Sequence, residues 1–225
     1  DKFTGRVLDL GCGKRPYESM LGDKAARWIG IDLPVTHSGP PHVDAYASGT
    51  ALPFRDASFD IVLCTEVIEH VPEPDLLFSE IARVLRGGRF LILTAPQAHV
   101  LHEIPHDYFR FTRYGLAYLA RKNGLAVETV QAFGGILAFI GQHLANHVPL
   151  LTTRRLGRGH RAAGQAGNQW LFWHCDRLLH CVYHGAEEST LGNLLVARKV
   201  GTTRAREERE QGGRTASSFR RSGER

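Results

Sequence analysis

Residues 7–13 read Val-Leu-Asp-Leu-Gly-Cys-Gly, an apolar run that ends in two glycines around Cys12. The run predicts a buried strand over residues 7–10, and the glycines predict a tight turn at its carboxyl end. In an open α/β sheet, ligands bind at the carboxyl ends of the strands, because glycines let a ligand approach the backbone and the following helix offers unpaired N–H groups. This stretch therefore predicts an α/β fold with a ligand site at the turn.

Short apolar runs alternate with helical patterns from Arg6 onward, which favours βαβ units around a parallel sheet. Strands are predicted over residues 7–10, 28–32, 42–46, 61–65, 89–94, 126–132 and 191–199. One helix is predicted to begin at Pro74, which suits a first turn, and to end at Gly87. Thr112 is the predicted N-cap of a second helix, which stops at Gly124.

Two segments interrupt this alternation. Residues 95–111 form a long connection, and connections of that length in compact domains are usually functional or disordered. Residues 134–185 hold two apolar helical stretches, 136–151 and 168–184, separated by a basic linker. We expect 134–185 to be a helical insertion before the last strand, packed near the active face, within one domain that covers residues 1–200.

The positive charge lies in two appendages. The 225 residues include 28 Lys+Arg and 23 Asp+Glu, for a net charge of +5. The basic linker, 154–161, holds four Arg and no acid, and residues 201–225 hold seven Arg and four Glu, which leaves the rest at −2. The tail has too few apolar residues to offset its ordering entropy, so we expect 201–225 to be a disordered basic tail. A near-neutral fold does not favour a nucleic-acid partner.

No transmembrane segment is expected, because the purely apolar stretch 132–141 is too short to span a bilayer. The four cysteines form neither a zinc pair nor a disulfide framework, which favours a reducing, cytoplasmic setting. Trp170, Phe172 and Trp173 beside the basic linker can form a peripheral membrane contact. The alternative that we favour is a lid or a homodimer contact.

Two carboxylates strengthen the evidence for a ligand site at the turn. Asp9 precedes the first glycine by two residues and can accept from an ammonium group or order the loop. Asp32 closes the second predicted strand, where a carboxylate suits the two hydroxyls of a ribose. Lys14, Arg15 and Pro16 follow the turn in place of a third glycine, which disfavours a pyrophosphate and hence a nicotinamide oxidoreductase.

The sequence resembles the class I S-adenosylmethionine-dependent methyltransferases, in their methyltransferase type 11-like branch. The resemblance rests on VLDLGCG, IGIDL, LPFRDASFDIVLCTEVIEHVPEP and RVLRGGRFLILTAP, in that order. It implies a Rossmann-like three-layer α/β sandwich with a mostly parallel seven-stranded sheet that binds S-adenosyl-L-methionine. The implied methionine contacts are Asp9, Gly11, Cys12, Gly13, Cys64 and Glu66. Asp32 would hold the ribose, and Leu33 would lie against the adenine. Ser48 and the Gly49 backbone would form hydrogen bonds with the adenine. Ser48 stands where many relatives have an Asp.

The connection 95–111 is the predicted source of acceptor contacts. His106 is the preferred general base, with Asp107 as its orienter, Tyr108 as a wall and Arg110 as an anion contact. In the alternative, Asp107 and Arg110 pair to hold the loop. Four residues of the loop can ligate metal, but they lack paired helical spacing, so we predict no metal site from His99, His102, Glu103 and His106.

The predicted activity is methyl transfer to an oxygen or nitrogen of a small-molecule or glycan-like acceptor. PHDYFRFT and the following GLAYLARKNGL resemble methyltransferases of glycan and natural-product pathways. Two alternatives stay open: an RNA or protein methyltransferase, in which the basic linker lines the mouth of the site, and a non-catalytic nucleotide-binding module.

Overall fold

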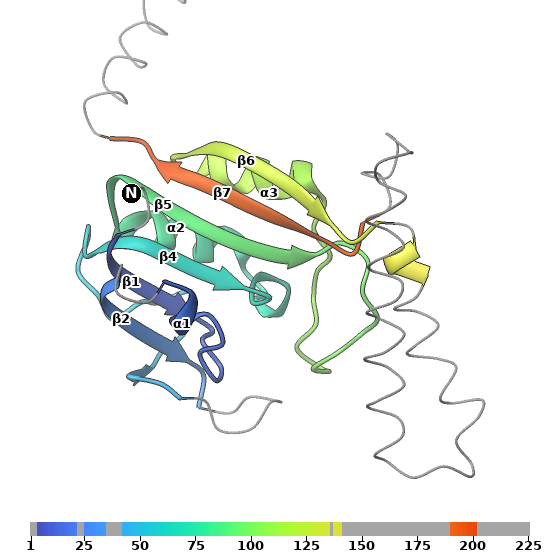
Figure 1. The fold of residues 1–225 in the computed structure, drawn as a ribbon, viewed down its shortest axis with the longest axis horizontal. Coiled ribbons are helices and arrows are strands. Elements are labelled where there is room, and N and C mark those ends of the chain that lie inside the picture. The colour runs from blue at the N-terminus through green and yellow to red at the C-terminus, as the bar shows by residue number, and fades with distance from the viewer. Residues whose placement is uncertain (1–3, 22–24, 35–41, 136, 141–189, 202–225) are drawn as a thin grey trace, which may run out of the picture.

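A computed structural model describes residues 4–21, 25–34, 42–135, 137–140 and 190–201 (Figure 1). Its main elements, in chain order, are β1 (Gly5–Leu10), α1 (Glu18–Leu21), β2 (Ala25–Asp32), β3 (Ala45–Tyr46), β4 (Phe59–Thr65), the 3-10 turn η2 (Ile68–His70), α2 (Pro74–Val84), β5 (Leu85–Pro96), α3 (Arg113–Lys122), β6 (Leu125–Phe133) and β7 (Gly192–Lys199).

The strands form one seven-stranded sheet in the order β3-β2-β1-β4-β5-β7-β6. The pairs from β3 to β5 are parallel, whereas β7 is antiparallel to both of its neighbours, β5 and β6. In Figure 1 the β7 arrow accordingly points opposite to those of β4, β5 and β6. The predicted Rossmann-like seven-stranded fold is confirmed, with the correction that the sheet is mixed because its last strand is reversed.

The register aligns the carboxyl ends of the three central strands. Leu10 of β1 is opposite Cys64 of β4, and Cys64 is opposite Leu93 of β5. The glycine turn after β1, the turn after β4 and the long connection after β5 therefore leave the sheet at one edge. This edge is where an α/β sheet places its ligands.

The sheet is covered on the face that carries α2 and α3, which Figure 1 shows behind it. Leu77, Phe78 and Ile81 of α2 are fully buried, at the spacing that puts residues on one side of a helix. Each such side chain stabilises the fold by about 1.5–3 kcal/mol. Asp75 of α2 accepts from Lys122 Nζ at 2.8 Å, which joins α2 to α3.

Both predicted helix starts are confirmed, and one predicted end is not. α2 begins at Pro74, and the Thr112 hydroxyl accepts from the Gly115 N–H at 3.1 Å as the N-cap of α3. α2 ends at Val84 rather than at Gly87, because Leu85 is already extended and begins β5. The Gly87-Gly88 pair lies within β5.

Gly134, where the predicted insertion begins, and Leu191, which follows it, are hydrogen-bonded to each other where β6 ends and β7 begins. The Leu191 N–H donates to Gly134 O at 3.0 Å, and the Gln97 and Ala98 N–H groups donate to Leu191 O at 2.8 and 3.1 Å. The chain thus leaves β6 and rejoins β7 beside the start of the 95–111 connection. The basic linker, the three aromatics near it, Cys175, Cys181 and the tail beyond residue 201 lie outside the described residues. Within the described part, no helix is long and apolar enough to cross a membrane.

Candidate functional site

The glycine turn is tied to β2 and is open on its outer side. The N–H groups of Gly11 and Cys12 both donate to Ile31 O, at 2.9 and 3.1 Å. Gly11 has φ +70°, and a Cβ there would collide with Val67 Cγ2. Gly13 has φ +50°, but a Cβ there would meet no heavy atom within 4 Å. The chain therefore needs Gly11 for its own packing, whereas at Gly13 it leaves free space beside the backbone.

Asp32 holds this turn from the end of β2. Its Oδ2 accepts from the Gly13 N–H at 2.9 Å, and its Oδ1 accepts from the Leu33 N–H at 2.7 Å. A carboxylate oxygen can accept more than one hydrogen bond, so both oxygens keep acceptor capacity for ligand hydroxyls. The Leu33 side chain is 53% exposed next to this carboxylate, where it is free to cover a planar ring.

Asp9 is buried at the end of β1, and its Oδ2 has no hydrogen-bond partner among the described residues. Burial raises the pKa of this carboxyl to about 6, and Trp28 and Arg15 oppose the rise. A buried carboxylate that lacks a partner is destabilising unless a cation or a donor reaches it. Asp9 is therefore suited to receive a cationic part of a ligand.

The two described cysteines are free and buried. Burial raises the pKa of the Cys12 thiol to about 11, and Cys12 Sγ lies 3.6 Å from His42 O. Cys64 has no exposed surface, and burial raises the pKa of its thiol even further. The Cys64 side chain thus lies in the core at the end of β4, and its contact with the methionine part of a cofactor stays a prediction.

Glu66 follows β4 with an unusual backbone conformation. Its φ is +52°, and its N–H donates to Thr94 O at 3.2 Å. A residue other than glycine pays for this left-handed conformation in free energy, and such strain is concentrated at functional sites. Glu66 is exposed, so its carboxylate is available to a ligand at the sheet edge.

The predicted adenine contacts lie in a compact turn before Leu52. Ser48 Oγ lies 2.9 Å from Thr50 Oγ1 and also accepts from the Thr50 N–H at 3.3 Å. A Cβ on Gly49 would lie 2.7 Å from Leu77 Cδ1, so glycine is needed there for packing against the core. The contact of Ser48 and Gly49 with adenine stays a prediction.

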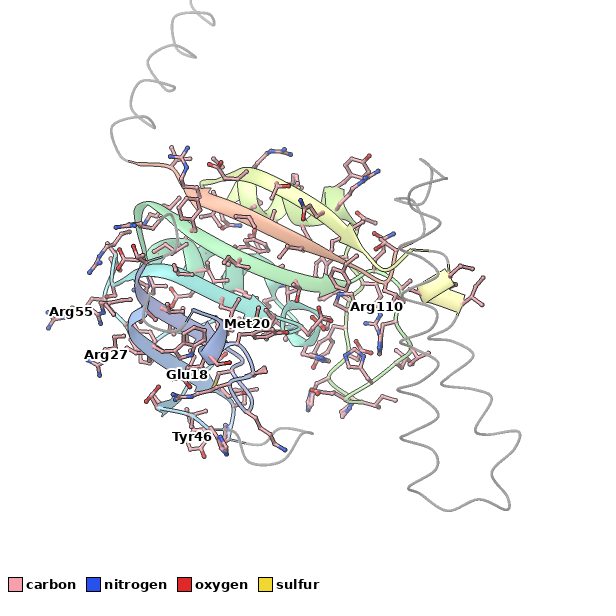
Figure 2. The ribbon with its side chains drawn as sticks, viewed as in Figure 1. Glu18, Met20, Arg27, Tyr46, Arg55 and Arg110 are labelled. Carbon is pink, nitrogen blue, oxygen red and sulfur yellow. The ribbon has the colours of Figure 1, made fainter. Side chains whose placement is uncertain are left out.

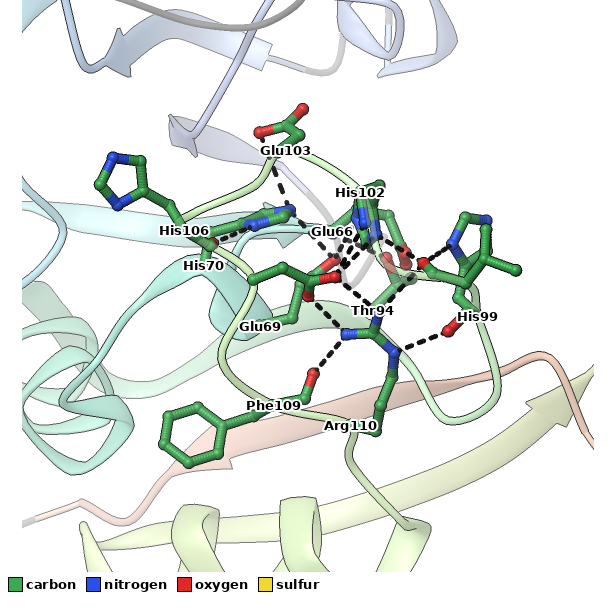
Figure 3. Close-up of polar contacts among 12 residues, drawn as sticks. Glu66, Glu69, His70, Thr94, His99, His102, Glu103, His106, Phe109 and Arg110 are labelled. Atoms are coloured by element: carbon green, nitrogen blue, oxygen red, sulfur yellow. Dashed lines mark hydrogen bonds and ion pairs between the residues drawn. The ribbon is translucent and has the colours of Figure 1, made fainter.

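The long connection is held by an ion pair. Arg110 makes two parallel hydrogen bonds to Asp107, Nη1 to Oδ1 at 2.5 Å and Nη2 to Oδ2 at 2.7 Å. The Arg110 hydrogen bonds hold the pKa of Asp107 far below its ordinary value. Arg110 also donates to the backbone oxygens of His99 and Val100 (Figure 3). The structure contains the Asp107–Arg110 pair of the alternative in which the two residues hold the loop, and an anion contact of Arg110 stays a prediction.

His106 is oriented by a different neighbour from the one predicted. Its Nδ1 lies 3.1 Å from Tyr108 Oη, and the Asp107 carboxylate is committed to Arg110 and to the His102 N–H. The structure thus places the Tyr108 hydroxyl, rather than the Asp107 carboxylate, next to His106 Nδ1, and the catalytic roles of His106 and Asp107 stay predictions. His106 and Tyr108 are both exposed. Figure 2 shows Arg110, which belongs to the same loop, on the side of the molecule opposite to Arg27 and Arg55.

Sequence reasoning missed a buried acid beside this loop. Glu69, in η2, has no exposed surface, and burial raises the pKa of its carboxyl to about 8. Its backbone oxygen accepts from the N–H groups of Tyr108 and Phe109, at 2.8 and 3.3 Å. The available signal was an acidic residue next to a histidine, Glu69-His70, between the apolar residues Ile68 and Val71 and shortly after the predicted strand 61–65.

Comparison with known proteins identifies relatives. A family model described as "Methyltransferase domain" matches residues 8–93. The chain is 31% identical over 159 residues to a ubiquinone biosynthesis O-methyltransferase of Aromatoleum aromaticum, covering 57% of this chain and 66% of that protein. It is 30% identical over 158 residues to the protein of the same name from Paraburkholderia phymatum, covering 57% and 68%. The chain spans between 37% and 68% of the length of its first curated relatives.

The fold also matches solved structures. A putative sarcosine dimethylglycine methyltransferase from Galdieria sulphuraria has a TM-score of 0.57 and 16% identity, covering 89% of this chain and 80% of that one. The turn itself fits S-adenosylmethionine: Asp9 lacks a partner where the cofactor's ammonium group can pair with it, Gly13 leaves open space, and Asp32 retains acceptor capacity for ribose hydroxyls. Sequence motifs, fold and site agree, and the chain belongs to the class I S-adenosylmethionine-dependent methyltransferases.

Proposed function

We propose that the protein transfers a methyl group from S-adenosylmethionine to an oxygen or nitrogen of a small-molecule or glycan-like acceptor. The observation that carries the proposal is the cradle formed by Asp9, Gly13 and Asp32, which opens at the same sheet edge as the 95–111 connection. When bound, the cofactor supplies an electrophilic methyl group on a sulfonium centre. The chain has to hold that centre, place the acceptor in line with it and exclude water.

The cradle holds the donor through complementary charge and shape. Asp9 would pair with the ammonium group, Asp32 would accept from the ribose hydroxyls, and the Gly13 backbone would lie against the cofactor because no side chain intervenes. Desolvated charge-assisted hydrogen bonds of this kind stabilise a complex by about 1.5–3 kcal/mol each. Glu66 would border the methionine end.

The acceptor side would use the long connection and the segment between β6 and β7. His106, oriented by Tyr108, is the candidate general base for a hydroxyl acceptor. The names of the curated relatives include O-methyltransferases, which supports an oxygen acceptor. Gly134 and Leu191, which flank this segment in the chain, are hydrogen-bonded to each other, and Leu191 O accepts from the N–H groups of Gln97 and Ala98. We therefore propose that residues 134–185 complete the acceptor pocket.

Two measurements test this function. Calorimetry with S-adenosylhomocysteine should give one site, and absence of binding would contradict the cradle. Transfer of labelled methyl from S-adenosylmethionine should then be assayed with phenols, sugars and amines as separate acceptor classes. Product from phenols or sugars supports an oxygen acceptor, product from amines supports a nitrogen acceptor, and product only from RNA or protein would contradict the proposal.

A variant pair tests the candidate base. His106→Gln should lower kcat by about 100-fold on a hydroxyl acceptor with unchanged affinity for S-adenosylhomocysteine, since general bases contribute about 100- to 10,000-fold. Tyr108→Phe removes only the hydroxyl next to His106 Nδ1 and should have a smaller effect in the same direction. Normal turnover by His106→Gln would leave this histidine without a catalytic role.

A further inference from the structure

We propose that Glu69, His70 and His102 bind a first-row divalent transition-metal ion such as Zn²⁺. The candidate ligand atoms of these three residues all lie within 4.8 Å of one another. Glu69 and His70 come from η2, directly after β4, and His102 comes from the 95–111 connection (Figure 3). The site is independent of the methyl-transfer function and differs from the prediction of no metal site from His99, His102, Glu103 and His106.

The buried carboxylate is the centre of the site. The Glu69 side chain has no exposed surface, and neither of its oxygens has a hydrogen-bond partner among the described residues. Two imidazole nitrogens lie near Oε1, His70 Nε2 at 3.8 Å and His102 Nε2 at 3.9 Å. A buried carboxylate without hydrogen bonds costs several kcal/mol of free energy unless a cation compensates it.

Hydrogen bonds to the opposite ring nitrogens determine which atom each histidine presents. His70 Nδ1 lies 2.7 Å from His106 O, and a carbonyl oxygen only accepts, so His70 Nδ1 carries a proton. His102 Nδ1 lies 3.2 Å from Val100 O and 3.3 Å from Asp107 Oδ2, and the same argument assigns a proton to it. In the neutral rings, both Nε2 atoms then have lone pairs on the side of Glu69.

Three electron-pair donors therefore face a common space. Two imidazole Nε2 atoms and one carboxylate cannot form hydrogen bonds with one another unless a proton is added, whereas one cation satisfies all three. Metal-binding histidines commonly have this arrangement, in which the other ring nitrogen donates to a carboxylate or a backbone carbonyl. The outer partners here are His106 O for His70, and Asp107 and Val100 O for His102.

The ligand types select the class of metal. Two imidazoles and one carboxylate suit Zn²⁺, Fe²⁺, Co²⁺ or Ni²⁺, whereas Mg²⁺ and Ca²⁺ prefer oxygen ligands. Tetrahedral Zn²⁺ with bonds of about 2.0–2.2 Å places its ligands about 3.4 Å apart, so the two Nε2–Oε1 distances would shorten by about half an ångström. Glu103 Oε2, 3.9 Å from His70 Nε2, is near enough to serve as a fourth ligand.

Backbone and side-chain hydrogen bonds hold the loop that carries His102 against η2. The Asp107 carboxylate, paired with Arg110, accepts from the His102 N–H at 2.9 Å, and Glu69 O holds the backbone of Tyr108 and Phe109. His70 and His102 keep 16% and 28% of their side-chain surface exposed, so an ion can reach the site from solvent.

The test is competitive titration of the metal-free full-length chain with Zn²⁺ against a chromophoric chelator. The wild-type chain should bind one Zn²⁺ at least tenfold more tightly than Glu69→Gln, His70→Asn or His102→Asn. His42→Gln is the matched control, because His42 is exposed and its hydrogen bonds to Gly13 and Arg15 are made by its backbone, so this variant should bind like the wild type. Equal affinity in the wild type and the three variants would overturn the proposal, and so would Mg²⁺ displacing Zn²⁺ at equal concentration.

X-ray absorption of the Zn²⁺-loaded wild-type chain keeps the test decisive if a variant does not fold. Two imidazoles and a carboxylate in the first shell support the site. A shell of water oxygens, or unchanged imidazole scattering in His102→Asn, would overturn it. Neither the titration nor the absorption measurement depends on methyl transfer. Both therefore test the metal site even if the chain transfers no methyl group.

Discussion

Asp32 Oδ2 accepts from the Gly13 N–H at 2.9 Å, so the carboxylate at the end of β2 holds the turn that follows β1. In the proposed function, this one side chain both shapes the cradle and would offer acceptors to the cofactor. Asp32→Ala should raise the Kd for S-adenosylhomocysteine by roughly 10- to 150-fold, which corresponds to about 1.5–3 kcal/mol. Calorimetry measures this change. Asp56→Ala, an exposed carboxylate paired with Arg83, is the control, and an effect of equal size there would remove Asp32 from the site.

The two glycines of the turn should respond differently to the same substitution. Gly13→Ala adds a methyl group in open space, so it should cost about 1 kcal/mol of stability for the left-handed φ but weaken S-adenosylhomocysteine binding at least tenfold. Gly11→Ala should cost about 2–4 kcal/mol, because its Cβ also collides with Val67. Val67→Ala should restore part of that loss in the double variant. Denaturant melts and calorimetry separate the two effects, and unchanged cofactor affinity in Gly13→Ala would contradict the cradle.

Asp9 should make stability depend on pH. Burial raises the pKa of its carboxyl from an ordinary 3.8 to about 6, so the native state binds more protons than the unfolded state between these values. The Asp9 contribution to the free energy of unfolding therefore falls as the pH rises from about 4 to 6. Asn cannot ionise, so Asp9→Asn should be more stable than the wild type at pH 7 by about 1–3 kcal/mol and equal to it near pH 4. Urea unfolding across this range measures the difference.

Asp60 provides the control of opposite sign for Asp9. Burial alone would raise the pKa of Asp60, but hydrogen bonds from the Arg6 N–H and from Arg86 lower it below its ordinary value. The contribution of Asp60 to the free energy of unfolding is therefore fully present at a pH above the ordinary pKa of an aspartate and is lost as the pH falls below it. Asp60→Asn should be less stable than the wild type at pH 7. A wild-type advantage over Asp9→Asn at pH 7 would contradict the burial argument.

The Asp107–Arg110 pair should hold the loop without contacting the cofactor. Arg110→Ala leaves the Asp107 carboxylate, whose side chain is 2% exposed, without its main partner, which should cost roughly 3 kcal/mol. Hydrogen exchange of the amides from 98 to 109 should accelerate, turnover should fall, and affinity for S-adenosylhomocysteine should be retained. Asp107→Asn combined with Arg110→Ala should recover part of the stability, because no buried charge is then left. Unchanged exchange in Arg110→Ala would show that the pair does not hold the loop.

The sequence predicts most of the fold because its signals are local. Val7–Leu10 and the glycines after it are adjacent in the chain, and Pro74 and Thr112 act within one helical turn. The end of α2 departs from the pattern because pairing with β4 draws Leu85 into β5 before Gly87 is reached. Local helix signals were overridden there by the sheet.

The acceptor side is less predictable, because its contacts join distant segments. Glu69 and His102 are 33 positions apart and meet only because the loop folds back on η2. The sequence offers Asp107 either His106 or Arg110 as a partner, and no periodicity in 95–111 decides between them or places Tyr108 next to His106. The residues of the proposed cofactor cradle could be predicted from the sequence because they follow strand ends, and ligands of α/β sheets bind at the aligned carboxyl ends of the strands.

The hydrogen bond from the Leu191 N–H to Gly134 O brings the end of β6 and the start of β7 together at one edge of the sheet. β6 and β7 are separated from β1 and β2, which carry Asp9 and Asp32, by β4 and β5. The sheet thus divides its work: one side shapes the turn at Gly13, and the other side holds the two ends of the long connection. A substitution at the Gly134–Leu191 junction should therefore leave the geometry at Gly13 unchanged.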